Sequence, residues 1–223
     1  MQIHLEARRE LEAQLVDALG GTEDPLLGAG RRQAASNLLA RWSEPHRRYH
    51  TVTHLMAVLA ALELLFEGSQ PVRADDRVAL RLAAWFHDAV YEGSPGDDEE
   101  ASAALAGRLL GELGQPTDRV AEVVRLIRTT ATHSPEPGDH SAELLVDADL
   151  SVLGCSDREY RAYADAVRQE YGHVPEPLFR AGRAQVLRRL TAGERSYRTP
   201  RGRLLWEAAA RANVSAELAR LSR

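Results

Sequence analysis

Apolar residues recur at intervals of three and four along nearly every segment of this chain, and this period constrains the fold more than any other feature. Such spacing gathers apolar side chains on one face of an α-helix, whereas a half-buried strand needs alternation at every second residue, which is rare here. Glycine and proline separate the segments, as at Gly20, Pro45 and Gly68. The pattern therefore predicts an all-α protein.

Ten segments satisfy these rules, and we expect a helix in each. The predicted helices cover residues 3–19, 31–42, 51–66, 75–91, 97–113, 117–132, 142–153, 157–171, 177–191 and 200–221. Two starts carry specific capping chemistry. Ser156 with Glu159 fits a capping box, and Thr199 supplies a hydroxyl just before Pro200 at the first helical position.

No linker rich in glycine, serine or proline divides the chain, and the loops at 93–96 and 134–138 are short enough to join packed helices. We therefore expect one compact helical-bundle domain over residues 1–223. Its motif-bearing core would span about 45–155 and a C-terminal helical extension about 156–223.

All 28 basic residues are arginine, so every reaction that needs a lysine amine is excluded. Schiff-base catalysis, pyridoxal phosphate attachment and the lysine of a phosphate-binding P-loop all fall in this class. Arginine can still grip phosphate with two parallel hydrogen bonds. A net charge of −5 and an aromatic content of 5% argue against an extended nucleic-acid surface.

No apolar run reaches the roughly 18 residues of a membrane span, and residues 1–10 alternate charged with apolar side chains, unlike a signal peptide. We therefore expect no membrane partner and a cytoplasmic location. Cys155 is the only cysteine, which excludes an intrachain disulfide and a cysteine-clustered zinc site.

Histidines and carboxylates are unevenly placed, and the informative ones are His50, His54, the adjacent pair His87 and Asp88, His133, Asp147 and Asp149. An ionisable pair at the end of the apolar stretch 80–86 is costly unless it is paired or bound to metal. Neutral imidazole and carboxylate suit a divalent cation, with Mn, Fe, Ni, Zn, Co or Mg all acceptable.

The order His54, His87, Asp88, Asp149 resembles the HD superfamily of metal-dependent phosphohydrolases, in particular a branch of bacterial proteins predicted to be HD phosphohydrolases. Successive blocks carry the resemblance over roughly residues 40–215, an extent judged from the motifs. These blocks lie at 48–54, 85–91, 98–103, 130–133 and 147–154, and a C-terminal block includes 168–171, 179, 182–183 and 207–213.

The resemblance implies an all-α fold in which His54, His87, Asp88 and Asp149 hold one metal ion. Asp147 is the alternative for the last ligand, and the family's Ala-Asp pair favours Asp149. A metal in such a site lowers the pKa of a bound water and neutralises charge at phosphorus. The implied reaction is hydrolysis of a phosphate ester or anhydride of a small molecule, with a nucleotide as one option.

Supporting roles follow from the same blocks. Glu99 and Glu100 also have a simpler explanation, because acidic residues favour the first turn of a helix and Asp97 with Glu100 resembles a capping box. The expected catalytic residues are Asp88, Glu92, Glu99, Glu100 and His133, and the expected substrate-binding residues are Arg48, His50, Arg168 and Arg183.

Two other functions stay open. Some HD-fold proteins are di-iron oxygenases, for which His133 and His140 would have to supply extra ligands. The fold also serves as a non-catalytic, nucleotide-binding regulatory module. The sequence leaves the oligomeric state open, with a homodimer as one option.

Overall fold

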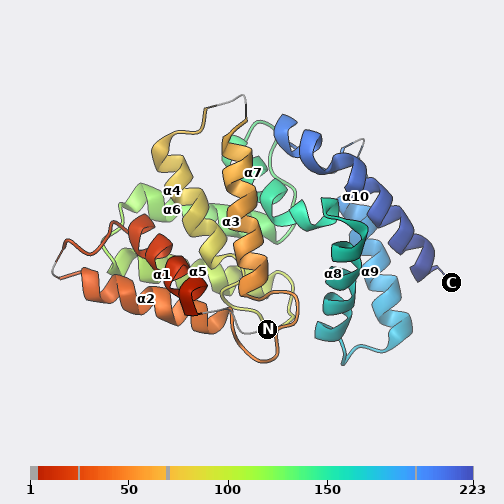
Figure 1. Cartoon of the computed structure of the whole chain (residues 1–223), viewed down its shortest axis with the longest axis horizontal. Coiled ribbons are helices and arrows are strands. Elements are labelled where there is room, and N and C mark those ends of the chain that lie inside the picture. The colour runs from red at the N-terminus through yellow and green to blue at the C-terminus, as the bar shows by residue number, and fades with distance from the viewer. Residues whose placement is uncertain (1–4, 25, 69–70, 194, 223) are drawn as a thin grey trace. The chain divides into compact units, whose positions relative to one another are not determined.

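A computed structural model describes residues 5–24, 26–68, 71–193 and 195–222. The described residues are helical, without strands (Figure 1), which confirms the all-α prediction. The helices are α1 (Leu5–Ala18), α2 (Gly28–Arg41), α3 (Val52–Phe66), α4 (Ala74–Phe86), α5 (Asp97–Glu112), α6 (Thr117–Thr130), α7 (His140–Asp149), the 3-10 helix η1 (Leu150–Gly154), α8 (Asp157–Glu170), α9 (Glu176–Leu190) and α10 (Pro200–Leu221). The predicted start at Ile3 lies outside the described residues.

The chain divides into two compact units. The first comprises residues 1–56 and 72–134, and the second comprises residues 57–71 and 135–223. Helix α3 contributes its first residues to the first unit and the remainder to the second.

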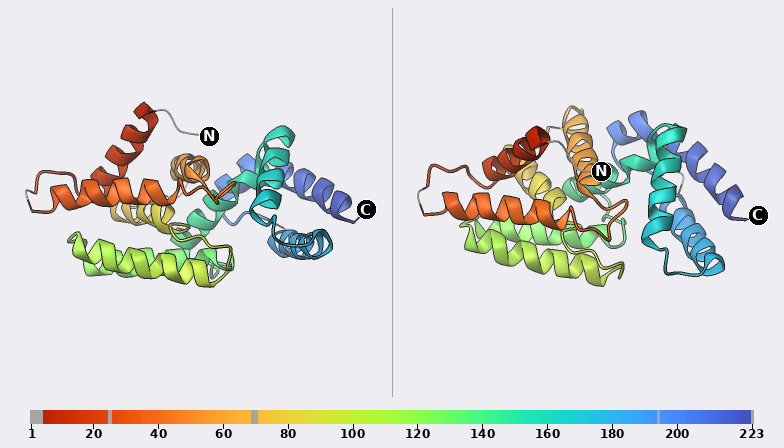
Figure 2. Two further views of the ribbon diagram at one scale, coloured as in Figure 1. Left: turned by 90° about the horizontal axis from the view of Figure 1, so that it is seen from below. Right: turned by 60° about the horizontal axis from the view of Figure 1, so that its bottom comes forward.

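In the first unit, α4, α5 and α6 pack against one another, and α1 packs on α2 and α4. Helices α5 and α6 lie side by side in every view (Figure 2). The turn between them is closed by Gly114, whose φ of +73° lets the chain leave α5 in the left-handed conformation. Trp42, Trp85 and Phe86 are the largest side chains buried in this core.

In the second unit, α10 packs along η1 and α9 and also contacts α8. Their apolar side chains form one buried cluster: Val146, Leu150, Leu153, Tyr160, Leu187, Tyr197, Ala210 and Val214. The segment predicted as one helix over 142–153 is divided, because the chain tightens from α7 into η1 at Leu150.

Both capping predictions are confirmed. Ser156 Oγ accepts the N–H of Glu159 while the Glu159 carboxylate accepts the N–H of Ser156. Thr199 Oγ1 accepts the N–H of Gly202 at 2.9 Å, with Pro200 in the first turn. The predicted box of Asp97 with Glu100 is wrong by one residue. Glu99 instead accepts the N–H of Gly96, since Gly96, with a positive φ, and not Asp97 is the N-cap of α5.

The predicted helix over 75–91 ends at Phe86. After Phe86 the backbone turns, with the N–H of Ala89 bonding the carbonyl of Phe86. Carbonyls at this end are satisfied by the side chains of Trp42 and Arg47 rather than by a further helical turn. This early end brings His87 and Asp88 into a turn.

Among the described residues, none of the helices combines the length and apolarity needed to cross a membrane.

Candidate metal centre

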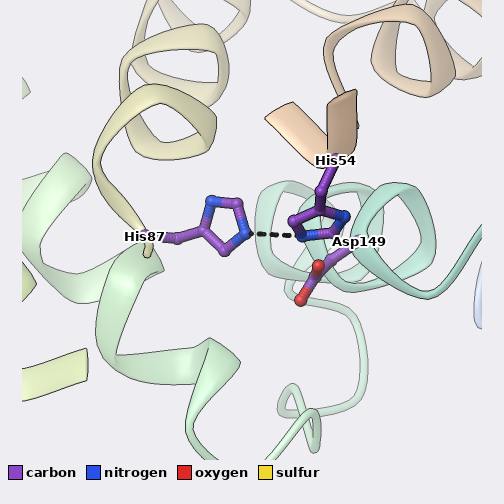
Figure 3. A group of neighbouring side chains, drawn as sticks. All are labelled: His54, His87 and Asp149. Carbon is purple, nitrogen blue, oxygen red and sulfur yellow. Dashed lines mark hydrogen bonds between the residues drawn. The ribbon is translucent and has the colours of Figure 1, made fainter. Parts of the chain in front are cut away.

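His54, His87 and Asp88 meet in the first unit, from two segments of the chain. His54 lies in the first turn of α3, and His87 and Asp88 directly follow α4. The Nε2 atoms of His54 and His87 are 3.3 Å apart. Asp88 Oδ2 lies 3.1 Å from His87 Nε2 and 3.6 Å from His54 Nε2. Three potential ligand atoms thus converge on one point, and Figure 3 shows the two imidazoles facing each other.

The backbone holds the ring of His87 through its Nδ1 atom. Its Nδ1 lies 2.8 Å from the carbonyl oxygen of Ala84. A carbonyl can only accept, so Nδ1 carries the proton and donates it. The Nε2 atom faces His54 and Asp88 and, in the neutral ring, is the atom that carries the lone pair. A hydrogen bond of this kind orients metal-binding histidines in proteins.

Asp88 is ionised in this setting. Burial alone would raise the pKa of its carboxyl, but the neighbouring imidazoles of His87, His54 and His50 outweigh burial and hold the pKa well below its ordinary value. Its side chain is 16% exposed, against 3% for His54 and 1% for His87. The carboxylate is therefore the most accessible edge of this group.

An aromatic group borders His54. The His50 ring stacks on Tyr91 with centroids 4.2 Å apart and meets Tyr49 edge-on at 4.7 Å. The Tyr49 ring in turn lies 4.7 Å from that of His54. His50, predicted as a substrate-binding residue, is thus held beside the two-histidine group, and its ring centroid is 5.7 Å from that of His54.

Two buried side chains that the sequence analysis missed tie the ligand-bearing segments together. Trp42 donates its indole N–H to the carbonyl of Trp85 at 3.0 Å. Arg47 donates to the carbonyls of His50, Asp88 and Ala89 at 3.1, 2.7 and 3.3 Å. Nothing in the pattern distinguished Arg47 from the adjacent Arg48, because only the folded backbone shows which carbonyls need a donor.

Asp147 and Asp149 belong to the second unit, and their roles differ. Asp147 is completely buried, and its carboxylate accepts hydrogen bonds from the N–H groups of Arg198 and Thr199 and from the Thr199 hydroxyl. Burial raises its pKa despite these bonds. Asp147 is thus committed to anchoring the start of α10. Asp149 is the last residue of α7.

The four remaining catalytic candidates lie in or beside loops. Glu92 is exposed, and its N–H donates to Asp98. Glu99 caps α5, and Glu100 forms an exposed pair with Arg128 at 2.6 Å. The Arg128 hydrogen bonds lower the pKa of Glu100. His133 follows α6 with a left-handed φ of 51° and donates its N–H to Thr129.

The structure gives Arg168 and Arg183, both predicted substrate ligands, partners within the second unit. Arg168 bonds Glu176 and the carbonyls of Tyr171 and Val174. Arg183 is buried and forms an ion pair with Glu217 at 2.9 Å. Both guanidinium groups hold helices and turns in place.

Arg48 is exposed and donates to the carbonyl of Pro45. His140, the second histidine required for a di-iron site, begins α7 in the second unit, with Nδ1 4.0 Å from Glu143. Burial raises the pKa of the Cys155 thiol to about 11, so this cysteine is a poor nucleophile at neutral pH.

No protein-family model, no curated protein and no solved structure matches the chain. The side chains of the candidate centre therefore carry the case for its chemistry.

Proposed function

We propose that the protein is a metal-dependent phosphohydrolase that uses one divalent ion, held by His54, His87, Asp88 and Asp149. The observation that carries the proposal is the convergence of two imidazole nitrogens and one carboxylate oxygen within 3.1–3.6 Å of one another. Imidazole nitrogens and carboxylate oxygens are the atoms that divalent cations bind in proteins, and an ion at this point would contact all three.

The distances fit a metal. An ion with bonds of about 2.0–2.1 Å to two nitrogens in tetrahedral geometry separates those nitrogens by about 3.3 Å. The Nε2 atoms of His54 and His87 have this separation. The orientation of the His87 ring supports the same assignment, because Nε2 faces the common point while Nδ1 bonds the carbonyl of Ala84.

For the fourth ligand we propose Asp149. The resemblance to HD phosphohydrolases favours this residue, because the family's Ala-Asp pair aligns with Ala148 and Asp149. Asp147 is disfavoured, because its carboxylate is already occupied by Arg198 and Thr199. A set of two histidines and two carboxylates suits Mn, Fe, Ni, Zn, Co or Mg.

The reaction follows from this ligand set. A divalent ion there would acidify a water and offset negative charge developing at phosphorus. The Asp88 carboxylate is more exposed than the rings of His54 and His87, so it presents the edge that substrate and water would approach. The resemblance to HD phosphohydrolases supports the same class of reaction, with a small phosphorylated molecule as substrate.

The test is phosphate release from a panel of nucleotides and sugar phosphates, with Mn, Ni, Co and Mg supplied in turn. Asp88→Ala should lose both bound metal and turnover while keeping its helical circular dichroism. Asp97→Ala, which removes an exposed carboxylate from the first turn of α5, is the control and should retain both. Full turnover in Asp88→Ala would refute the proposal.

A further inference from the structure

We propose that Arg47 is a positioning residue that holds the two ligand-bearing segments in register and thereby sets the affinity of the metal centre. The inference rests on the proposed function and adds a determinant outside the ligand set. The guanidinium of Arg47 donates to backbone carbonyls and to Glu44 rather than to a ligand side chain. It acts on the backbone that carries the ligands.

The guanidinium of Arg47 bridges the start of α3 and the turn after α4. Nη1 donates to the carbonyl of His50, which lies four residues before His54, and to that of Asp88. Nη2 donates to the carbonyl of Ala89. One rigid group thus joins the peptide that leads to His54 with the peptides that follow His87. A change in these bonds changes the separation of the two imidazoles.

Arginine is required for this arrangement because its donors form a planar fork. Arg47 uses Nε, Nη1 and Nη2 for three carbonyls and one carboxylate, the last being Glu44 at 3.0 Å. A lysine ammonium would keep the charge but has only three donors at a single point. It could not reach both ligand-bearing segments in the same directions.

The surroundings of Arg47 hold its guanidinium group in place. The Arg47 side chain is fully buried, and Glu44 balances its charge. Its guanidinium carbon lies 5.6 Å from the centre of the Trp42 ring and 5.4 Å from that of Tyr91. Aromatic faces attract cations at such distances. The group is therefore enclosed on several sides and has little freedom to shift.

Binding of Co²⁺ to the metal-free protein tests the inference, because the visible spectrum of this ion reports coordination geometry. We expect Arg47→Lys to bind Co²⁺ about 10–100-fold more weakly than wild type, the range seen when outer partners of metal ligands are removed. Its visible bands should also shift, while the helical circular dichroism stays unchanged. Wild-type affinity and an unaltered spectrum in Arg47→Lys would overturn the inference.

Arg31 provides the matched control. It is a second buried arginine of the first unit, and its guanidinium donates to the carbonyls of Gly20 and Gly21 after α1. Arg31→Lys and Arg47→Lys should both lower the melting temperature. Only Arg47→Lys should weaken Co²⁺ binding, and equal weakening in both would show that lost stability is the cause and would overturn the positioning role.

Glu44→Ala covers the case in which Arg47→Lys does not fold. It removes the carboxylate that orients Nε of Arg47 but leaves the three carbonyl bonds possible. We expect a severalfold loss of Co²⁺ affinity, and unchanged affinity would overturn the inference. Failure of the proposed metal centre gives a different result, since wild type itself would then bind no Co²⁺, and failure of hydrolysis alone would appear only in the phosphate-release assay.

Discussion

The carboxylate of Asp147 accepts hydrogen bonds from both the backbone N–H and the side-chain hydroxyl of Thr199, at 2.8 and 2.7 Å, across 52 residues of chain. Thr199 is the residue that caps α10, so Asp147 holds the cap that starts the longest helix among the described residues. Asp149, two residues later, ends α7 and is the proposed fourth metal ligand. Two aspartates that are nearly adjacent in the sequence therefore have separable roles.

Exchange of each aspartate for alanine should separate these roles. Asp147→Ala leaves two backbone N–H groups unpaired in a buried site, and we expect a loss of about 1–3 kcal/mol in the free energy of unfolding. Bound metal should be retained. Asp149→Ala should lose metal with little change in the stability of the metal-free protein. Urea unfolding in chelator, together with metal analysis of each purified variant, measures both. Loss of metal in Asp147→Ala alone would reverse the assignment.

Arg183 and Glu217 form a buried ion pair in the second unit, and Tyr160 donates a further hydrogen bond to Glu217. Arg183→Ala leaves that carboxylate buried without its cation, so we expect a loss of about 3–5 kcal/mol. The control is Arg161→Ala, which breaks a pair with Asp157 whose side chains are both 63% exposed. We expect it to cost no more than about 0.5 kcal/mol. Similar losses in the two variants would contradict the structure.

Gly154 lies at the end of η1 against α10. A Cβ at this position would meet the backbone of Trp206, with its Cα and carbonyl oxygen both at 2.8 Å. Because backbone cannot move aside as a flexible side chain can, Gly154→Ala should destabilise the protein by about 1–3 kcal/mol. Gly182→Ala in α9, where a Cβ meets nothing within 4 Å, should instead stabilise it by about 0.5–1 kcal/mol. Thermal unfolding of the two variants gives the comparison, and equal melting temperatures would refute it.

Glu207 makes stability depend on pH. Burial would raise the pKa of its carboxyl, but the N–H groups of Ser196 and Tyr197 and the guanidinium of Arg211 outweigh burial and lower the pKa. A carboxyl whose pKa is lower in the folded state stabilises the fold above its unfolded pKa, about 4.3 for glutamate, and loses this contribution as pH falls through the folded value.

Glu207→Gln should therefore be less stable than wild type at pH 7, and the difference should shrink as pH falls below about 4.3. Urea unfolding of both proteins between neutral and acid pH measures this. Glu10→Gln on the exposed face of α1 supplies the baseline. A stability difference that grows toward acid pH would show that the pKa of Glu207 is raised, not lowered, by folding.

The helices were predictable because their signal is local. Apolar spacing, the Ser156 cap and the Thr199 cap each act within a few residues, and all three are confirmed. A predicted helix end was wrong where side chains that are distant in the sequence bond the last carbonyls of the helix. Helix α4 stops at Phe86 because Trp42 and Arg47 satisfy carbonyls near its end. No local pattern around residue 86 carries that information.

The candidate metal centre was also predictable only in part. The apolar stretch before them marked His87 and Asp88 as candidate ligands, since imidazole and carboxylate are costly in an apolar environment without a partner. The resemblance to HD phosphohydrolases added His54 and Asp149. The convergence of His54, His87 and Asp88 within 3.1–3.6 Å, the bond of His87 Nδ1 to Ala84 and the anchoring role of Asp147 depend on folding. So does the difference between Arg47 and Arg48, because two identical side chains acquire different functions only when one is buried among carbonyls and the other faces solvent.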